Sequence, residues 1–119
     1  MQLNMLELGG QTVAEVLSEE VVINDTRDAL DLMATAQYQG ATGIVLYEKN
    51  LKPEFFDLKT GMAGEILQKY TNYRMRIAIV GDFEKFESKS LKAFIVESNR
   101  GKMVAFVSDR ETALAKISS

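Results

Sequence analysis

The segment Met75–Val80, which reads MRIAIV, constrains the fold of this chain more than any other part of it. Apart from Arg76 it is apolar, and it ends at Gly81-Asp82, a pair of residues that favours a turn. A strand in which polar and apolar residues do not alternate needs a cover on both faces, as central strands of helix-flanked parallel sheets have. We therefore expect this segment to be a central strand of such a sheet.

Strand-type and helix-type patterns alternate along the rest of the chain. The first two strand-type runs flank Gly9-Gly10, a dipeptide that favours a hairpin turn. Strands that alternate with helices pair in parallel through right-handed crossovers, and the hairpin adds one antiparallel strand. The expected fold is therefore α/β, with a five-stranded, mixed but mostly parallel sheet and about four helices in one domain over residues 1–119. The expected elements are strands at 2–8, 11–17, 43–47, 75–80 and 103–107, and helices over 26–40, 62–70, 91–101 and 111–117.

The expected helices start at polar residues that can cap them. Asp25 precedes the first helix, and Thr60 stands at a natural N-cap position before the second. Ser108 and Glu111 have the spacing of a capping box before the last helix. The apolar stripe expected on the first helix consists of Ala29, Leu30, Met33, Ala34 and Ala36.

The sequence lacks two residue types that enzymes and metal sites use most often. Without cysteine it has no disulfide and no thiolate, and without histidine it has no imidazole base or metal ligand. Any catalysis would depend on carboxylates, lysine, arginine and hydroxyls, with a hard cation such as Mg²⁺. We therefore expect no cofactor, no resident metal and no catalytic residues.

Charge and hydropathy restrict the partners and the compartment. The net charge of −3 and the isoelectric point near 5.0 provide no basic surface for nucleic acid. No apolar run approaches the length of roughly 18 residues that a membrane span needs, and the N-terminal residues do not resemble a signal peptide. We expect a cytoplasmic protein that binds neither nucleic acid nor membranes.

A ligand site is expected where the parallel strands end, because open α/β sheets bind ligands at the carboxyl ends of their strands. This edge would collect Asn24 and Asp25 after the second strand, the connection at 48–60 after the third, Asp82 after the fourth and Asp109 after the fifth. Such an acidic edge suits a hard cation or a cationic partner, but acidic residues also cap helices. Both interpretations stay open at this point.

The connection at 48–60 is longer than the usual strand-to-helix loop, and long ordered loops are often functional. Phe55 and Phe56 are adjacent in it, so either one of them lies near the surface as a contact for a partner or both are buried under the loop. Gly61 allows close backbone approach at the start of the following helix, where free N–H groups attract anions. The remaining candidates for an anion or metal site are Asp57, Lys59, Thr60 and Asp82.

Several segments, PEFFDLKTGMAGEILQK at 53–69 above all, resemble the bacterial domain of unknown function 4180 family. The resemblance covers nearly the whole chain and implies no assigned activity. The order of elements also resembles the STAS, or anti-sigma-factor-antagonist, fold, in which a phosphorylatable serine and a glycine open the helix after the third strand. Here Asp57, Thr60 and Gly61 stand at that place, with threonine for serine and one residue more after the acid. Phosphorylation of Thr60 is the hypothesis that this resemblance implies.

Two functions compete, and a third, a carrier of a lipid or another apolar ligand, would require an open cavity. The first is a non-catalytic regulatory or protein-interaction module that meets a protein partner with the Phe55–Phe56 loop and the carboxyl-end edge. The second is a small-anion or nucleotide-binding protein, with or without enzymatic activity, that uses the helix start at Thr60-Gly61. The absence of histidine and cysteine favours the first.

Overall fold

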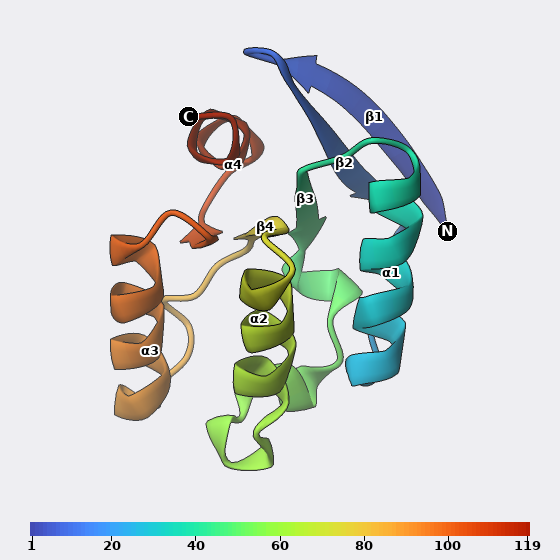
Figure 1. Cartoon of the computed structure of the whole chain (residues 1–119). Helices are drawn as coiled ribbons and strands as arrows, with labels where there is room; N and C mark the ends of the chain where they lie inside the picture. The colour runs from blue at the N-terminus through green and yellow to red at the C-terminus, as the bar shows by residue number, and fades with distance from the viewer.

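The computed structural model describes all residues from 1 to 119 (Figure 1). Strands and helices follow the predicted order, with a series of short 3₁₀ turns in the long connection after the third strand. The strands are β1 (Gln2–Leu8), β2 (Gln11–Leu17), β3 (Gly43–Tyr47), β4 (Arg76–Val80) and β5 (Val104–Val107). The helices are α1 (Thr26–Tyr38), α2 (Met62–Asn72), α3 (Lys89–Arg100) and α4 (Arg110–Ile117).

The strands lie in the sheet in the same order as in the sequence, β1-β2-β3-β4-β5. β1 and β2 form an antiparallel hairpin around Gly9 and Gly10, which both have positive φ, and the other three pairs are parallel. This confirms the predicted α/β fold with a five-stranded, mostly parallel sheet. The run that begins at Met75 supplies β4, which has β3 on one side and β5 on the other.

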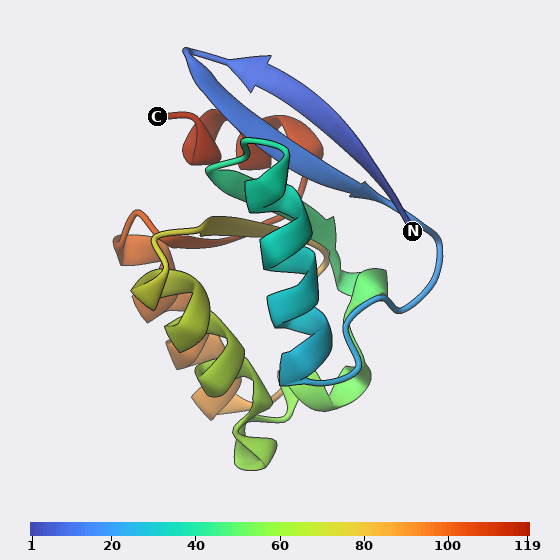
Figure 2. The ribbon, with the colours of Figure 1, turned by 45° about the vertical axis from the view of Figure 1, so that its right-hand side comes forward.

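Successive crossovers between neighbouring strands place α1, α2 and α3 on one face of the sheet, and α4 packs on the other (Figures 1 and 2). In β3, Ile44 and Leu46 therefore belong to the larger core under α1–α3, whereas Val45 belongs to a smaller core under α4. The sheet needs a cover on both faces, as the apolar run in β4 predicts. α4 is short, and it covers only part of its face.

Buried side chains of α1 and α2 meet in the larger core. The inward face of α1 contains Leu32, which the predicted stripe omits, and Ala34 is exposed, so the prediction was wrong at these two positions. Leu30 is half-buried and packs against the core, as predicted. The hydroxyl of Tyr70 on α2 donates a hydrogen bond to the Ala29 carbonyl at 2.7 Å. Burial raises the pKa of the Tyr70 hydroxyl.

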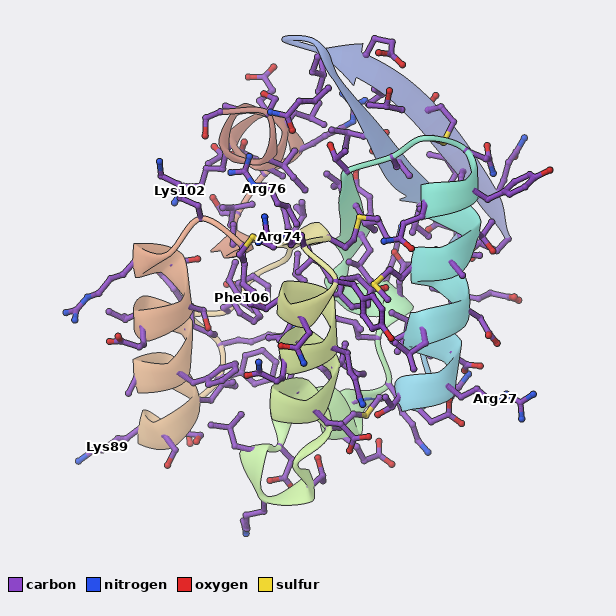
Figure 3. All side chains as sticks on the ribbon, in the orientation of Figure 1. Arg27, Arg74, Arg76, Lys89, Lys102 and Phe106 are labelled. Atoms are coloured by element: carbon purple, nitrogen blue, oxygen red, sulfur yellow. The ribbon has the colours of Figure 1, made fainter.

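Side-chain caps from Asp25, Ser88 and Asp109 fix three of the helix starts, and an arginine holds one helix end. Asp25 caps α1 as predicted, by accepting the Asp28 amide hydrogen at 2.8 Å. In α4 the cap is Asp109, one residue later than the predicted Ser108, because its carboxylate accepts the Thr112 amide hydrogen at 2.7 Å. Arg76 donates hydrogen bonds to carbonyl groups at the end of α4 (Figure 3). None of the helices is both long enough and apolar enough to cross a membrane.

Candidate functional site

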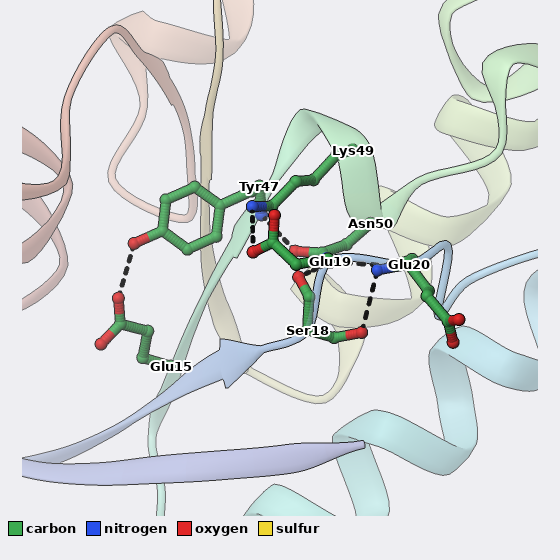
Figure 4. A network of polar contacts seen from close by, with 7 residues as sticks. All are labelled: Glu15, Ser18, Glu19, Glu20, Tyr47, Lys49 and Asn50. Carbon is green, nitrogen blue, oxygen red and sulfur yellow. Dashed lines mark hydrogen bonds and ion pairs between the residues drawn. The ribbon is translucent and has the colours of Figure 1, made fainter.

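The connection between β3 and α2 is ordered by three 3₁₀ turns and one buried asparagine. The turns span Glu48–Asn50, Pro53–Phe56 and Leu58–Thr60. The side chain of Asn50 is fully buried and accepts the Tyr47 amide hydrogen at 3.0 Å. Its amide group donates to the carbonyls of Ser18 and Glu20 at 3.0 and 2.9 Å, so it ties the connection to the segment after β2 (Figure 4).

Both phenylalanines of the connection are buried. Phe55 is 1% exposed and Phe56 is 7% exposed, so the interpretation in which one of them lies at the surface was wrong. Phe56 stacks on Phe86 with ring centroids 5.1 Å apart, and it also meets Phe83 at 5.9 Å. The apolar Phe-Phe pair therefore anchors the connection to the loop after β4, because aromatic rings gain from both burial and edge or stacked contacts.

The predicted anion site lies at the exposed tip of the same connection. The hydroxyl of Thr60 is within hydrogen-bond distance of the carbonyls of Glu54 and Asp57, at 2.9 and 2.8 Å. The same oxygen accepts the Met62 amide hydrogen at 3.2 Å. Thr60 is the last residue of the 3₁₀ turn Leu58–Thr60 and is not part of α2. The N-cap of α2 is Gly61, which has φ of 77°, so the prediction that placed Thr60 there was wrong by one residue.

The candidate residues of the tip do not surround a cavity. Asp57 accepts the amide hydrogen of Lys59 at 3.2 Å and so closes a local turn. Asp57, Lys59, Thr60 and Gly61 line none of the cavities of the structure, whereas Asp82 lines a cleft that contains none of these four. No group of three or more acidic side chains is placed to hold a metal ion.

The loop from Gly81 to Ser88 connects β4 to α3 and separates two hollows at the carboxyl-end edge. Its first residues lie against Glu48, which accepts the Asp82 amide hydrogen at 3.3 Å and forms an ion pair with Lys85. A β-carbon at Gly81 would come within 2.7 Å of the Glu48 β-carbon, so glycine is needed for this approach. The smaller hollow, of about 510 Å³, has Phe56 and Phe86 in its wall.

The larger hollow lies between this loop, α3 and the end of β5, and we term it the α3–β5 cleft. It has a volume of about 910 Å³. Phe83 and Phe106, whose rings meet edge to face at 5.3 Å, contribute to its apolar wall. Phe106 is labelled in Figure 3. The residues that line it are Gly81, Asp82, Phe83, Glu84, Lys92, Ile95, Val96, Phe106, Val107 and Ser108.

A buried ionic cluster that the sequence did not reveal lies on the α4 face of the sheet. Glu15 in β2 is 3% exposed. Arg110 at the start of α4 donates hydrogen bonds to the two carboxylate oxygens of Glu15 at 2.8 and 3.0 Å. Tyr47 donates its hydroxyl hydrogen to Glu15 at 2.5 Å (Figure 4). The side-chain amide of Asn4 donates to Glu15 at 3.2 Å.

The ion pair controls the titration of this cluster. The bonds from Arg110 are the largest cause that lowers the pKa of Glu15 to about 2, against the opposing effect of burial. Burial and the neighbouring carboxylate raise the pKa of Tyr47 to about 12. At neutral pH the carboxylate is therefore charged and the phenol is neutral. The cluster ties α4 to β2 and β3 with every acceptor oxygen of Glu15 in use.

The structure thus defines a small α/β protein whose sheet keeps the sequence order of its strands and whose widest hollow opens at the carboxyl ends of β4 and β5. The chain belongs to the domain of unknown function 4180 (DUF4180) family, whose model matches residues 8–117. This confirms the family that the sequence resembled. No curated protein and no solved structure matches the chain.

Proposed function

We propose that this protein is a non-catalytic interaction module that binds an apolar segment of a partner protein in the α3–β5 cleft. The observation that carries the proposal is the apolar surface of α3 that the fold leaves uncovered. In that helix only Leu91 is buried, Ile95 is half-buried, and Val96 is 55% exposed. These side chains continue into the aromatic wall made by Phe83 and Phe106.

The composition of the cleft matches that of protein interaction sites. Its centre is apolar and aromatic, and its rim carries Asp82, Glu84 and Lys92, as interfaces with an apolar core and a polar rim do. Charges of both signs on the rim favour a segment with apolar anchors and polar flanks over a purely ionic ligand. An amphipathic helix presents such anchors at regular spacing and suits a groove beside another helix.

The distribution of ionisable groups supports a role without catalysis. Strongly displaced pKa values usually gather where an enzyme does its chemistry. Here the displaced groups are Glu15, Tyr47, Tyr70, Asp109 and Arg110, and none of them lines a cavity. Each has a structural reason for its shift, namely burial, an ion pair or a helix cap.

A STAS-like arrangement is part of the proposal. It is supported by the hairpin that leads into successive strand–helix units and by α1, α2 and α3 on one face of the sheet. In this view Thr60 stands in the connection where that fold is phosphorylated. Its hydroxyl lies at the exposed tip, within hydrogen-bond distance of two carbonyls, so a phosphate there would disturb the 3₁₀ turn before α2.

Site-directed photo-crosslinking tests the proposal. A photoreactive phenylalanine analogue at Val96, on the rim of the cleft, should capture a defined partner from an extract of the source cells. The matched control carries the same analogue at Tyr38, which is 93% exposed and lines no cavity. The proposal predicts a product that forms from position 96 and weakens with Ile95→Asp. Equal labelling from both positions, or none from position 96, would refute it.

Anion binding at Thr60-Gly61 stays a prediction. The amide groups of Ala63 and Gly64 in the first turn of α2 have no acceptor in the chain, as is usual at helix starts. Phosphorylated metabolites can be screened with and without Mg²⁺ by thermal unfolding, since a ligand at 100 times its Kd adds about 2.7 kcal/mol of stability. A ligand-induced rise in the unfolding temperature that persists in Ile95→Asp and disappears in Thr60→Pro would favour the anion site over the cleft.

A further inference from the structure

The two edges of the sheet differ in how their backbone groups are satisfied. At the β5 edge, Asn99 of α3 accepts the Phe106 amide hydrogen at 2.7 Å and donates to the Phe106 carbonyl at 3.1 Å. The Asn99 side chain thereby occupies the place of a neighbouring strand and blocks strand addition there. β1 forms the opposite edge, and its outer side faces no other part of the chain (Figure 2).

The hydrogen-bond pattern of the hairpin shows which groups of β1 are free. Thr12 of β2 directs its carbonyl to β3, where it accepts the Thr42 amide hydrogen at 2.9 Å. Glu7 lies opposite Thr12, so the backbone N–H and C=O of Glu7 point away from β2. The same alternation directs the backbone groups of Met5 and Leu3 outward.

Common protections of an edge strand are missing from β1. Its register with β2 is continuous over Gln2–Leu8, without a bulge. The segment contains no proline and no lysine, and Glu7 is its one charged residue. Open edges of this length and composition pair with another strand unless something covers them. The occupant of such an edge must itself be an extended chain.

We propose that a second copy of this chain covers the edge, with the two β1 strands antiparallel and a twofold axis at Met5. The outward groups fit this pairing, because Leu3 then lies opposite Glu7 of the second copy and Met5 lies opposite itself. Each of these pairs exchanges two backbone hydrogen bonds, about six in all. The two sheets join into one that continues through both copies, closed at each far end by Asn99.

Side chains are compatible with this register. Leu3 and Met5 are half-buried and lie on the α1–α3 face, where the apolar contact across the seam is at Met5 and each Leu3 lies beside Glu7 of the other copy. The only like charges, Glu7 of each copy, are separated by four residues along the strands, or about 13 Å, which exceeds the screening length at physiological salt. Met5 of one copy contacts Met5 of the other at the axis.

A charge-swap experiment tests the proposed dimer because position 5 faces itself. Sedimentation velocity of the wild type should show a dimer that dissociates on dilution. Met5→Lys and Met5→Glu, each measured alone, should dissociate at concentrations at least about tenfold higher, because like charges would then meet at the axis. An equimolar mixture of the two variants should regain the wild-type affinity. Unchanged far-UV circular dichroism shows that the variants fold.

Disulfide cross-linking gives an independent readout, because the chain has no cysteine and an introduced cysteine is therefore its only thiol. Opposed residues of a hydrogen-bonded antiparallel pair have α-carbons about 5.5 Å apart, within the range of a disulfide. Oxidised Met5→Cys should therefore form a covalent dimer, and the surface control Tyr38→Cys should not. A wild type that stays monomeric over a roughly hundred-fold range of concentration would overturn the proposal. A dimer that survives both charge variants would overturn it as well.

Discussion

Replacing Glu15 with glutamine should destabilise the protein in a way that depends on pH. The substitution keeps the volume of this buried side chain and removes the negative charge that pairs with Arg110. The native pKa of about 2 lies below the usual value of 4.5. Because each pKa unit corresponds to 1.36 kcal/mol, the charged form contributes about 3 kcal/mol at neutral pH. Glutamine should forfeit most of this contribution.

The direction of the pH dependence follows from linkage. A carboxylate whose pKa is lowered on folding stabilises the native state fully above its unfolded pKa, near 4.5. This stabilisation declines as the pH falls through the native value near 2, where it is reduced to less than about 0.5 kcal/mol. The difference between wild type and Glu15→Gln should therefore be about 3 kcal/mol near pH 7 and nearly vanish near pH 2.

Urea unfolding followed by circular dichroism at both pH values measures this difference. Glu7→Gln is the matched control, because it lies on the neighbouring strand, is exposed, and accepts one hydrogen bond from Thr12. Its effect should be less than about 0.5 kcal/mol at either pH. A destabilisation by Glu15→Gln that is the same at both pH values would refute the argument, because it would reflect packing rather than ionisation.

Two further stability predictions follow from the carboxyl-end edge. Asn50→Ala leaves the carbonyls of Ser18 and Glu20 and the amide of Tyr47 without their partner. It should lower the free energy of unfolding by about 2–3 kcal/mol in urea titrations. An effect below about 1 kcal/mol would show that the hydrogen bonds of Asn50 do not stabilise the connection. In Gly64→Ala the new β-carbon meets no atom within 4 Å, and alanine favours the helix by roughly 1 kcal/mol, so the melting temperature should rise. In Gly81→Ala the new β-carbon collides with Glu48, so the melting temperature should fall. Equal shifts for the two glycines would contradict this account.

The elements of the fold could be predicted because their signals are local. The apolar run in β4, the glycine pair between β1 and β2 and the apolar spacing of α2 are all contained in short windows. Boundaries depend on backbone geometry, and this is why the start of α2 moved from Thr60 to Gly61, whose left-handed conformation suits glycine.

The site was harder to predict because its residues are far apart in sequence. Glu15 lies 95 residues before Arg110 and 32 before Tyr47, so no local pattern links them. The one available signal was a charged residue inside a strand that needs a cover on both faces. The cleft likewise forms where α3 leaves the end of β5 uncovered. The amphipathic pattern of the helix does not specify how much of the strand the helix covers.

The proposed function requires that a segment of a partner protein binds in the α3–β5 cleft. Its most direct test is a titration of the ¹⁵N-labelled protein with the partner segment that the crosslink at position 96 captures. The amide shift changes should cluster on Asp82–Glu84, Ile95, Val96 and Phe106–Ser108, and they should be absent in Ile95→Asp. Changes centred on Asp57–Gly61, or on no contiguous surface, would contradict the proposed function.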